Sequence, residues 1–299
     1  MDSVLKDLID LLRLERIEKN IFRGDSRDIG SPQVFGGQVV GQALSAAQNT
    51  VKGRVAHSLH GYFLRRGDVD APIIYEVDRS RDGGSFSNRR VVAIQHGRPI
   101  LNLAASFHIS EEGISHQAKM PDVPGPNELE DVTNKNKNII ESVSPKMKQF
   151  LTKKRPFEFR HVESANVKFP KKIIPKKHIW IKSIDNLPEN LILHQNLLTY
   201  VSDYELLGTA ALTHGLSFAS GNVMMASLDH AIWFHREFKM DEWLLYAMDS
   251  PASYGARGLA RGQIFNQDGQ LVASTTQEGL IRAIDPNNKK PRSKPAHQK

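Results

Sequence analysis

The chain repeats itself imperfectly, with short motifs recurring about 170 residues apart. His57-Ser58-Leu59-His60 returns as Ala226-Ser227-Leu228-Asp229, and the turn at His96-Gly97 returns at Asp268-Gly269. A period of this size is that of a domain and not of a solenoid unit. Chance similarity between two strand-rich halves is the alternative, but the order of predicted elements agrees as well. The sequence therefore predicts two similar folding units.

Each unit is predicted to hold a central helix and an antiparallel sheet. Apolar residues at helical spacing predict helices over residues 3–15, 35–51 and 194–212, the last containing Asp203. Alternating patterns bounded by turn residues predict strands over residues 58–64, 73–80, 87–95, 100–109, 179–184, 223–228, 231–235, 243–250, 256–265 and 271–282. The predicted fold class is α+β, with each central helix wrapped by its own sheet.

Composition along the chain suggests four segments. We expect a first repeat with a leading helix over residues 1–119, a linker and basic connecting segment over 120–177, a second repeat over 178–285 and a basic disordered tail over 286–299. The tail is rich in proline and lysine and poor in apolar residues, so it cannot bury a core. Removing its five basic residues lowers the formal net charge from +7 to +2.

The basic charge could in principle serve nucleic-acid or membrane docking. The tail reads more simply as a solvated segment, and the basic zone over residues 146–182 lacks the interleaved aromatic residues of a single-strand binder. We therefore predict no nucleic-acid partner. No run of about 18 apolar residues occurs, so we also predict no integral membrane segment.

Several chemistries are excluded by motif. The chain has no cysteine, and it lacks the nucleophile elbow, the phosphate loop, the dinucleotide fingerprint and the H-E-x-x-H metal motif. His230 and His235 lie five apart on a predicted strand and should face opposite sides of it. We expect no metal and no cofactor. Acid–base or water-activating chemistry remains.

Six motifs, in order along the chain, resemble a known family. They are Phe35-Gly36-Gly37-Gln38-Val39-Val40-Gly41-Gln42-Ala43, His57-Ser58-Leu59-His60-Gly61-Tyr62-Phe63, Asp82-Gly83-Gly84-Ser85-Phe86, Ser202-Asp203-Tyr204, Ser227-Leu228-Asp229-His230-Ala231-Ile232-Trp233-Phe234-His235 and Gln277-Glu278-Gly279. From about Val4 to Arg282 the chain is similar to the acyl-CoA thioesterase II family. The resemblance implies a double hotdog fold and hydrolysis of acyl-CoA thioesters to free fatty acid and CoA.

The resemblance also implies the site residues. In that family a water is oriented by residues that match Asp203, Ser227 and Gln277 here, all in the second repeat. Each alone has a simpler interpretation, as a surface acid, a small strand residue and an exposed amide, and only the joint match favours a site. By the repeat offset their first-half counterparts lie near Gly36, Ser58 and Phe107, which include no acid and no amide.

The residue types suit direct attack by water. An aspartate can accept the proton of water, while a serine hydroxyl and a glutamine amide can orient it towards a thioester carbon. A backbone N–H at a helix end is the expected donor to the oxyanion. Asp229 and His230 form a second-choice acid–base pair, with a supporting role as the main expectation.

Two other functions and two further properties stay open at this point. A hotdog enzyme that hydrates enoyl-CoA would need a histidine beside the acid, and a non-catalytic acyl-CoA binding module would need neither. Self-association through the sheets is possible. The resemblance implies a peroxisomal matrix location, with the cytoplasm as the alternative because the sequence ends in His297-Gln298-Lys299 and not in Ser-Lys-Leu.

Overall fold

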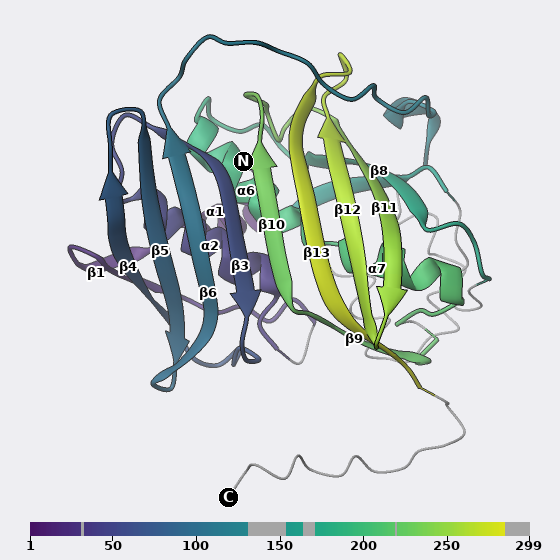
Figure 1. Ribbon diagram of the computed structural model, residues 1–299, viewed down its shortest axis with the longest axis horizontal. Helices are drawn as coiled ribbons and strands as arrows, with labels where there is room; N and C mark the ends of the chain where they lie inside the picture. The colour runs from purple at the N-terminus through teal and green to yellow at the C-terminus, as the bar shows by residue number, and fades with distance from the viewer. Residues whose placement is uncertain (31–32, 131–153, 164–170, 219, 285–299) are drawn as a thin grey trace, which may run out of the picture.

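One antiparallel sheet with helices on a single face forms the framework of the protein (Figure 1). The computed structural model describes residues 1–30, 33–130, 154–163, 171–218 and 220–284. The predicted tail over 286–299 and much of the segment 120–177 lie outside these residues, so the domain boundaries stay a prediction. Within the described part of the chain, no helix is long and apolar enough to cross a membrane.

The first half contains α1 (Ser3–Leu12), a short hairpin and a helix followed by four strands, of which the last three form a meander and the first pairs with the last. These elements are β1 (Glu15–Glu18), β2 (Ile21–Gly24), α2 (Gly36–Gln48), β3 (Val55–Phe63), β4 (Ile73–Asp82), β5 (Phe86–Gln95) and β6 (Arg98–His108). Apolar side chains alternate along the meander strands and face the helices. This half follows the predicted order, with the hairpin added.

The second half repeats the plan after a short 3₁₀ helix, η1 (Pro126–Glu128). Its elements are β7 (Phe157–His161), β8 (Lys176–Ser183), α6 (Leu191–Val201), α7 (Leu206–Ala211), η2 (Leu212–His214), β9 (Val223–Ser227), β10 (Asp229–Phe234), β11 (Leu244–Tyr254), β12 (Arg257–Phe265) and β13 (Leu271–Ala283). The predicted hairpin between the last two strands turns at Gly269, whose φ of 77° suits glycine.

The strands of both halves join into one sheet. Their order is β1-β2-β4-β5-β6-β3-β10-β13-β12-β11-β8-β7, with β9 also paired to β13. The halves meet where β3 pairs with β10, His60 standing opposite Ala231. The His60 ring lies 3.0 Å from the Asp229 carboxylate across this seam. The outer face of the same strands exposes Tyr62 and Trp233, and self-association through it stays a prediction.

The helices α2 and α6 pack closely because glycines line their contact. The Cβ of an alanine at Gly37 would overlap the backbone oxygen of Tyr200, and one at Gly41 would lie 3.5 Å from the backbone oxygen of Asn196. The residue number rises along α2 from one contact to the next and falls along α6, so the two helices are antiparallel. Every residue of α2 from Gly37 to Gln48 is buried. The start of α2 is therefore brought against the end of α6.

The predicted helix over residues 194–212 is interrupted, which corrects the sequence-based expectation. It divides into α6 and α7, with residues 202–205 between them. Glu205, the residue before α7, adopts a left-handed backbone with φ of 63°, which is costly for a residue with a side chain. Its carboxylate pairs with Lys177 and lies 3.3 Å from His161. Asp203 thus sits in a helix break and not on a helix face.

We predict that Gly37→Ala destabilises the protein, because the added methyl group must push α2 away from α6. Overpacking of this kind costs about 1–3 kcal/mol. Gly208→Ala is the matched control, since Gly208 lies in α7 with no atom within 4 Å of the added Cβ. The control should be as stable as the wild type or more so, because alanine favours a helix. Chemical denaturation measures both, and equal stability of the two variants would contradict the proposed packing.

Candidate active site

The carboxylate of Asp203 bridges the two halves of the protein. Its Oδ2 accepts a hydrogen bond of 2.8 Å from the backbone N–H of Gly37, in the first turn of α2. Its Oδ1 accepts one of 2.5 Å from Nε2 of Gln277 on β13. The side chain is half-buried. A negative charge is favoured here because the N–H groups at a helix start carry partial positive charge.

The two glycines that begin α2 make this contact possible. A Cβ at Gly36 would lie 2.7 Å from Oδ2 of Asp203 and 3.0 Å from Cζ of Phe63. The residue that precedes them, Phe35, provides no side-chain cap. Asp203 therefore caps the helix from a distant part of the chain. Gly36, the predicted first-half counterpart of Asp203, is its direct neighbour.

Gln277 is completely buried, and its amide is oriented by its partners. A carboxylate can only accept hydrogen bonds, so the amide nitrogen of Gln277 must face Asp203. The same nitrogen lies 3.3 Å from Nδ1 of His230. The amide oxygen is thereby turned away and has no hydrogen-bond partner within the described ranges. A buried acceptor without a partner is costly and suits a bound water.

His230 is neutral and fixes the glutamine. Its Nε2 lies 2.9 Å from the hydroxyl of Ser202, which in turn donates to the Thr199 carbonyl at 3.0 Å. The one hydroxyl hydrogen is used in that way, so Nε2 must carry the ring proton and Nδ1 must accept from Gln277. Burial lowers the pKa of His230 below its ordinary value, although Asp203 and Asp229 act in the opposite direction.

Ser227 ends β9, opposite Gly279 of β13. Because side chains two residues apart share a face of a strand, Ser227 lies on the same face as Gln277. It is half-buried, and its hydroxyl makes no hydrogen bond to Asp203, to Gln277 or to any other residue that the structure describes. The structure therefore joins Asp203 and Gln277 directly and places Ser227 beside them without a bond.

Sequence reasoning missed two parts of the arrangement. The Gly37 N–H was hidden because backbone groups leave no mark in a sequence, although paired glycines at a helix start could have suggested it. The contact of Ser202 with His230 was also not predicted, because the two residues lie 28 positions apart. His230 was the second choice for acid–base chemistry, and its complete burial assigns it a positioning role instead.

Two surface pockets of about 490 and 440 Å³ lie in the first half of the chain. Neither is lined by Asp203, Ser227 or Gln277. Among the residues that the structure describes, no group of three or more histidines and acids could hold a metal ion. The arrangement at Asp203 offers a general base, an oriented amide and a hydroxyl.

Comparisons with known proteins agree on one family. The family model described as acyl-CoA thioesterase matches residues 147–280, and that of the acyl-CoA thioesterase N-terminal domain matches residues 23–108. Acyl-CoA thioesterase 2 of Haemophilus influenzae is 43% identical over 94% of this chain and 99% of its own length.

Solved structures show the same relationship. An acyl-CoA thioesterase II from Mycobacterium marinum superimposes with a TM-score of 0.76 at 40% identity, over 95% of this chain and all of its own. A protein with a hot dog fold from Alicyclobacillus acidocaldarius gives 0.74 at 18% identity, over 93% of this chain and 99% of its own. The predicted double hotdog architecture is thereby confirmed.

We predict that His230 makes stability fall in mild acid. Its pKa is lower in the folded state than in the unfolded chain, where it is about 6.5. Below pH 6.5 only the unfolded state takes up the proton, so the free energy of unfolding falls by up to about 1.4 kcal/mol per pH unit. The loss ends once the pH reaches the folded-state pKa.

The comparison of His230→Gln with the wild type isolates this effect. Urea denaturation between pH 7.5 and 5 should give a shallower dependence in the variant, because glutamine does not titrate. His116→Gln, at an exposed histidine, serves as control and should keep the wild-type slope. The same slope in all three proteins would refute a neutral, buried His230.

Proposed function

We propose that this chain, which belongs to the acyl-CoA thioesterase family, hydrolyses its substrate by direct attack of one water. The water would be bound by Asp203, Gln277 and Ser227. Thioester hydrolysis is the activity of the family; the residues and their roles are the proposal. The observation that carries it is the Asp203 carboxylate, fixed by Gly37 and Gln277 beside an unpartnered amide oxygen.

The hydrogen bonds of such a water balance. It would donate one hydrogen to Asp203 and the other to the free Oε1 of Gln277, and it would accept from the hydroxyl of Ser227. Its remaining lone pair is then free to point at the thioester carbon. Three fixed partners hold the nucleophile in one orientation before reaction, which lowers the entropic part of the barrier.

The reaction then needs no covalent intermediate. Asp203 takes a proton as the water oxygen bonds to the acyl carbon. The oxyanion would be stabilised by the Gly36 N–H, which has no partner among the described residues and lies at the positive end of α2. Collapse breaks the carbon–sulfur bond, and Asp203 returns the proton to the leaving sulfur. The products are the free acid and CoA.

The hydratase alternative is disfavoured by His230. Hydration of an enoyl-CoA would need a histidine that reaches the substrate. His230 is completely buried and both of its ring nitrogens have partners, so it can orient Gln277 but not exchange protons with a ligand. A non-catalytic binding module would release no thiol, and the same assay tests it.

Compartment and assembly belong to the proposal as well. A peroxisomal location follows from the resemblance alone, and the Haemophilus relative is bacterial, so the cytoplasm is an equal candidate. Self-association would use the outer face at Tyr62 and Trp233, which are 55% and 41% exposed. Exposed aromatic residues on neighbouring strands suit a protein interface.

We predict that Asp203→Asn lowers kcat for saturated acyl-CoAs by about 10² to 10⁴, since it removes the general base. The asparagine amide must turn its NH₂ group towards the Gly37 N–H or the Gln277 amide, so the variant also loses some stability, and its folding is checked by circular dichroism. Free thiol released over time measures the rate. Asp268→Asn, in the exposed turn before β13, is the control and should retain full activity. Near-normal hydrolysis by a folded Asp203→Asn protein would overturn the proposed mechanism.

Ser227→Ala should reduce kcat about tenfold, the effect of one lost hydrogen bond to the water. Ser58 provides an internal control, because it is the first-half counterpart of Ser227 in the repeat. Ser58→Ala should leave kcat unchanged. If both serines were equally dispensable, Ser227 would have no part in holding the water.

A further inference from the structure

A second pocket in the first half carries strong positive charge. It has a volume of about 440 Å³ and lies at the far end of α2 from Asp203. One acid, Asp82, lines it. Its basic side chains are Arg16, Lys19, Lys52, Arg54, Arg79 and Arg89. The acyl-CoA chemistry proposed above uses none of these residues.

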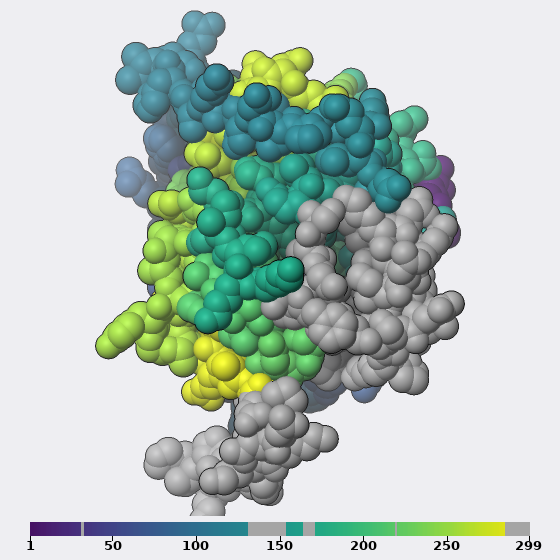
Figure 2. Space-filling model, turned by 90° about the vertical axis from the view of Figure 1, so that its right-hand side faces the viewer, coloured from purple at the N-terminus to yellow at the C-terminus, as the bar shows by residue number. Residues whose placement is uncertain are grey.

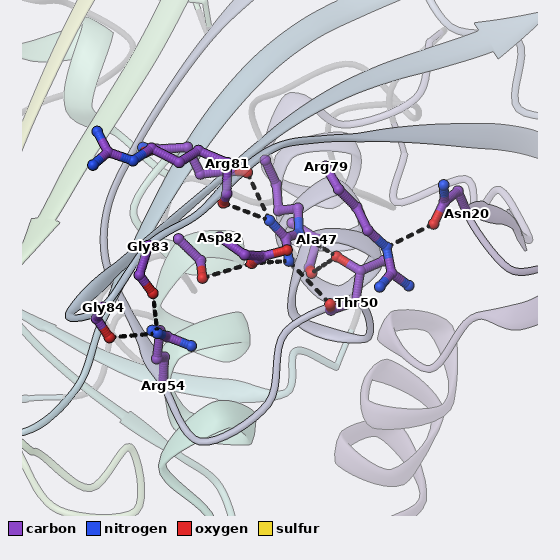
Figure 3. Close-up of polar contacts among 12 residues, drawn as sticks. Asn20, Ala47, Thr50, Arg54, Arg79, Arg81, Asp82, Gly83 and Gly84 are labelled. Atoms are coloured by element: carbon purple, nitrogen blue, oxygen red, sulfur yellow. Dashed lines mark hydrogen bonds and ion pairs between the residues drawn. The ribbon is translucent and has the colours of Figure 1, made fainter.

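Little of this charge is neutralised inside the protein. Arg89 pairs with Asp82 at 2.7 Å, but the other five basic residues have no carboxylate partner among the described residues. Figure 3 shows that Arg54 donates instead to the carbonyls of Gly83 and Gly84, both at 2.6 Å, and Arg79 to the side chain of Asn20 at 2.9 Å. Neutral acceptors orient a guanidinium group without cancelling its charge.

The pocket has a fixed floor. Arg89 is 2% exposed and donates to the hydroxyl and the carbonyl of Thr50, at 2.7 and 3.1 Å, besides Asp82. Two further bonds reach the carbonyls of Arg81 and Asn88. The Thr50 hydroxyl in turn donates to Ala47 at the end of α2. Above this floor, Arg16 and Arg79 come from the strands β1 and β4, and Lys19, Lys52 and Arg54 come from the segments that connect regular elements.

Donors remain free above the floor. Arg79 uses only its Nε, and the ammonium groups of Lys19 and Lys52 have no partner within the part of the chain described. Guanidinium and ammonium groups that line one pocket together with a single acid, itself paired with Arg89, are the groups that bind phosphate oxygens. We propose that this pocket binds a compact anion with two phosphate groups.

Size and lining favour a small ligand over a nucleic acid. A volume of about 440 Å³ lies in the range of ordinary small-molecule sites. No aromatic side chain lines the pocket, so successive bases could not stack there. Two sources offer the phosphate chemistry: inorganic pyrophosphate, and the nucleotide portion of CoA.

The pocket is separate from the site at Asp203. Asp203 contacts the first turn of α2, whereas Thr50 follows its last turn. A helix of 13 residues is about 20 Å long, so one phosphate group cannot serve both places. The inference therefore does not depend on the catalytic roles proposed for Asp203, Gln277 and Ser227, and only its CoA outcome rests on the proposed function.

Isothermal titration calorimetry tests the inference on the full chain. Pyrophosphate and adenosine 3′,5′-bisphosphate are titrated separately into the wild type and into the double variant Lys52→Ala/Arg79→Ala. We expect the double variant to bind pyrophosphate at least tenfold more weakly. The matched control, Arg98→Ala/Lys119→Ala, removes the same charge from exposed residues elsewhere and should bind like the wild type.

The two ligands distinguish the sources. If the nucleotide of CoA is the ligand, adenosine 3′,5′-bisphosphate should bind the wild type at least tenfold more tightly than pyrophosphate does, and the double variant should lose this tighter binding. Equal affinities for the two ligands indicate that the phosphate groups alone are recognised. No binding of either ligand to the wild type at millimolar concentration, or equal weakening in both variants, overturns the proposal.

Measuring thioester hydrolysis in the same variants distinguishes a failure of the pocket proposal from a failure of the mechanism proposed at Asp203. The double variant should keep the wild-type kcat at saturating acyl-CoA, because neither residue touches the site at Asp203; its KM should rise if the pocket holds the nucleotide of CoA and stay unchanged if it does not. Asp203→Asn should bind pyrophosphate normally. Loss of pyrophosphate binding in Asp203→Asn would show that the ligand occupies the site at Asp203 and would overturn the assignment to this pocket.

Discussion

The capping of one helix by an acid from the other half of the chain is the contact on which this structure depends. Asp203 accepts the hydrogen bond of the Gly37 N–H at the start of α2, and the positive end of that helix stabilises the carboxylate, which pairs with no cation among the described residues. The contact requires that the two helices approach closely, which glycines at positions 36, 37 and 41 permit. Fold and proposed chemistry therefore share one interaction. Figure 2 shows the side of the molecule on which residues of the second half, in teal, green and yellow, form most of the coloured surface.

The site is positioned by a chain of polar contacts that runs inward from Asp203. Gln277 links the acid to His230, and His230 links Gln277 to Ser202 and so to α6. Each member is buried or half-buried, where a hydrogen bond is strong and an unpaired group is costly. Within the described ranges the amide oxygen of Gln277 has no partner, and the water proposed between Asp203 and Gln277 would complete the network.

Much of this could be predicted from the sequence, and the exceptions have physical reasons. The meander strands, their hairpins and α2 follow regular patterns. The strand β1 reads Glu-Arg-Ile-Glu and is exposed throughout, so no alternation marks it. The break after α6 contains Glu205 in a left-handed conformation, and its carboxylate pairs with Lys177, 28 positions away, a contact that local sequence patterns do not reveal. Arg89 is 2% exposed and bonded to Thr50 and Asp82, a burial that nothing in its sequence context indicates.

The most direct test of the central claim follows the oxygen of the attacking water. With enzyme in excess over acyl-CoA, a single turnover in ¹⁸O-water should place one ¹⁸O atom in the fatty acid and none in the peptide that carries Asp203. Direct attack by water predicts this result. Unlabelled fatty acid together with ¹⁸O in the Asp203 carboxylate would show that the acyl group passes through a covalent anhydride, and it would contradict the account.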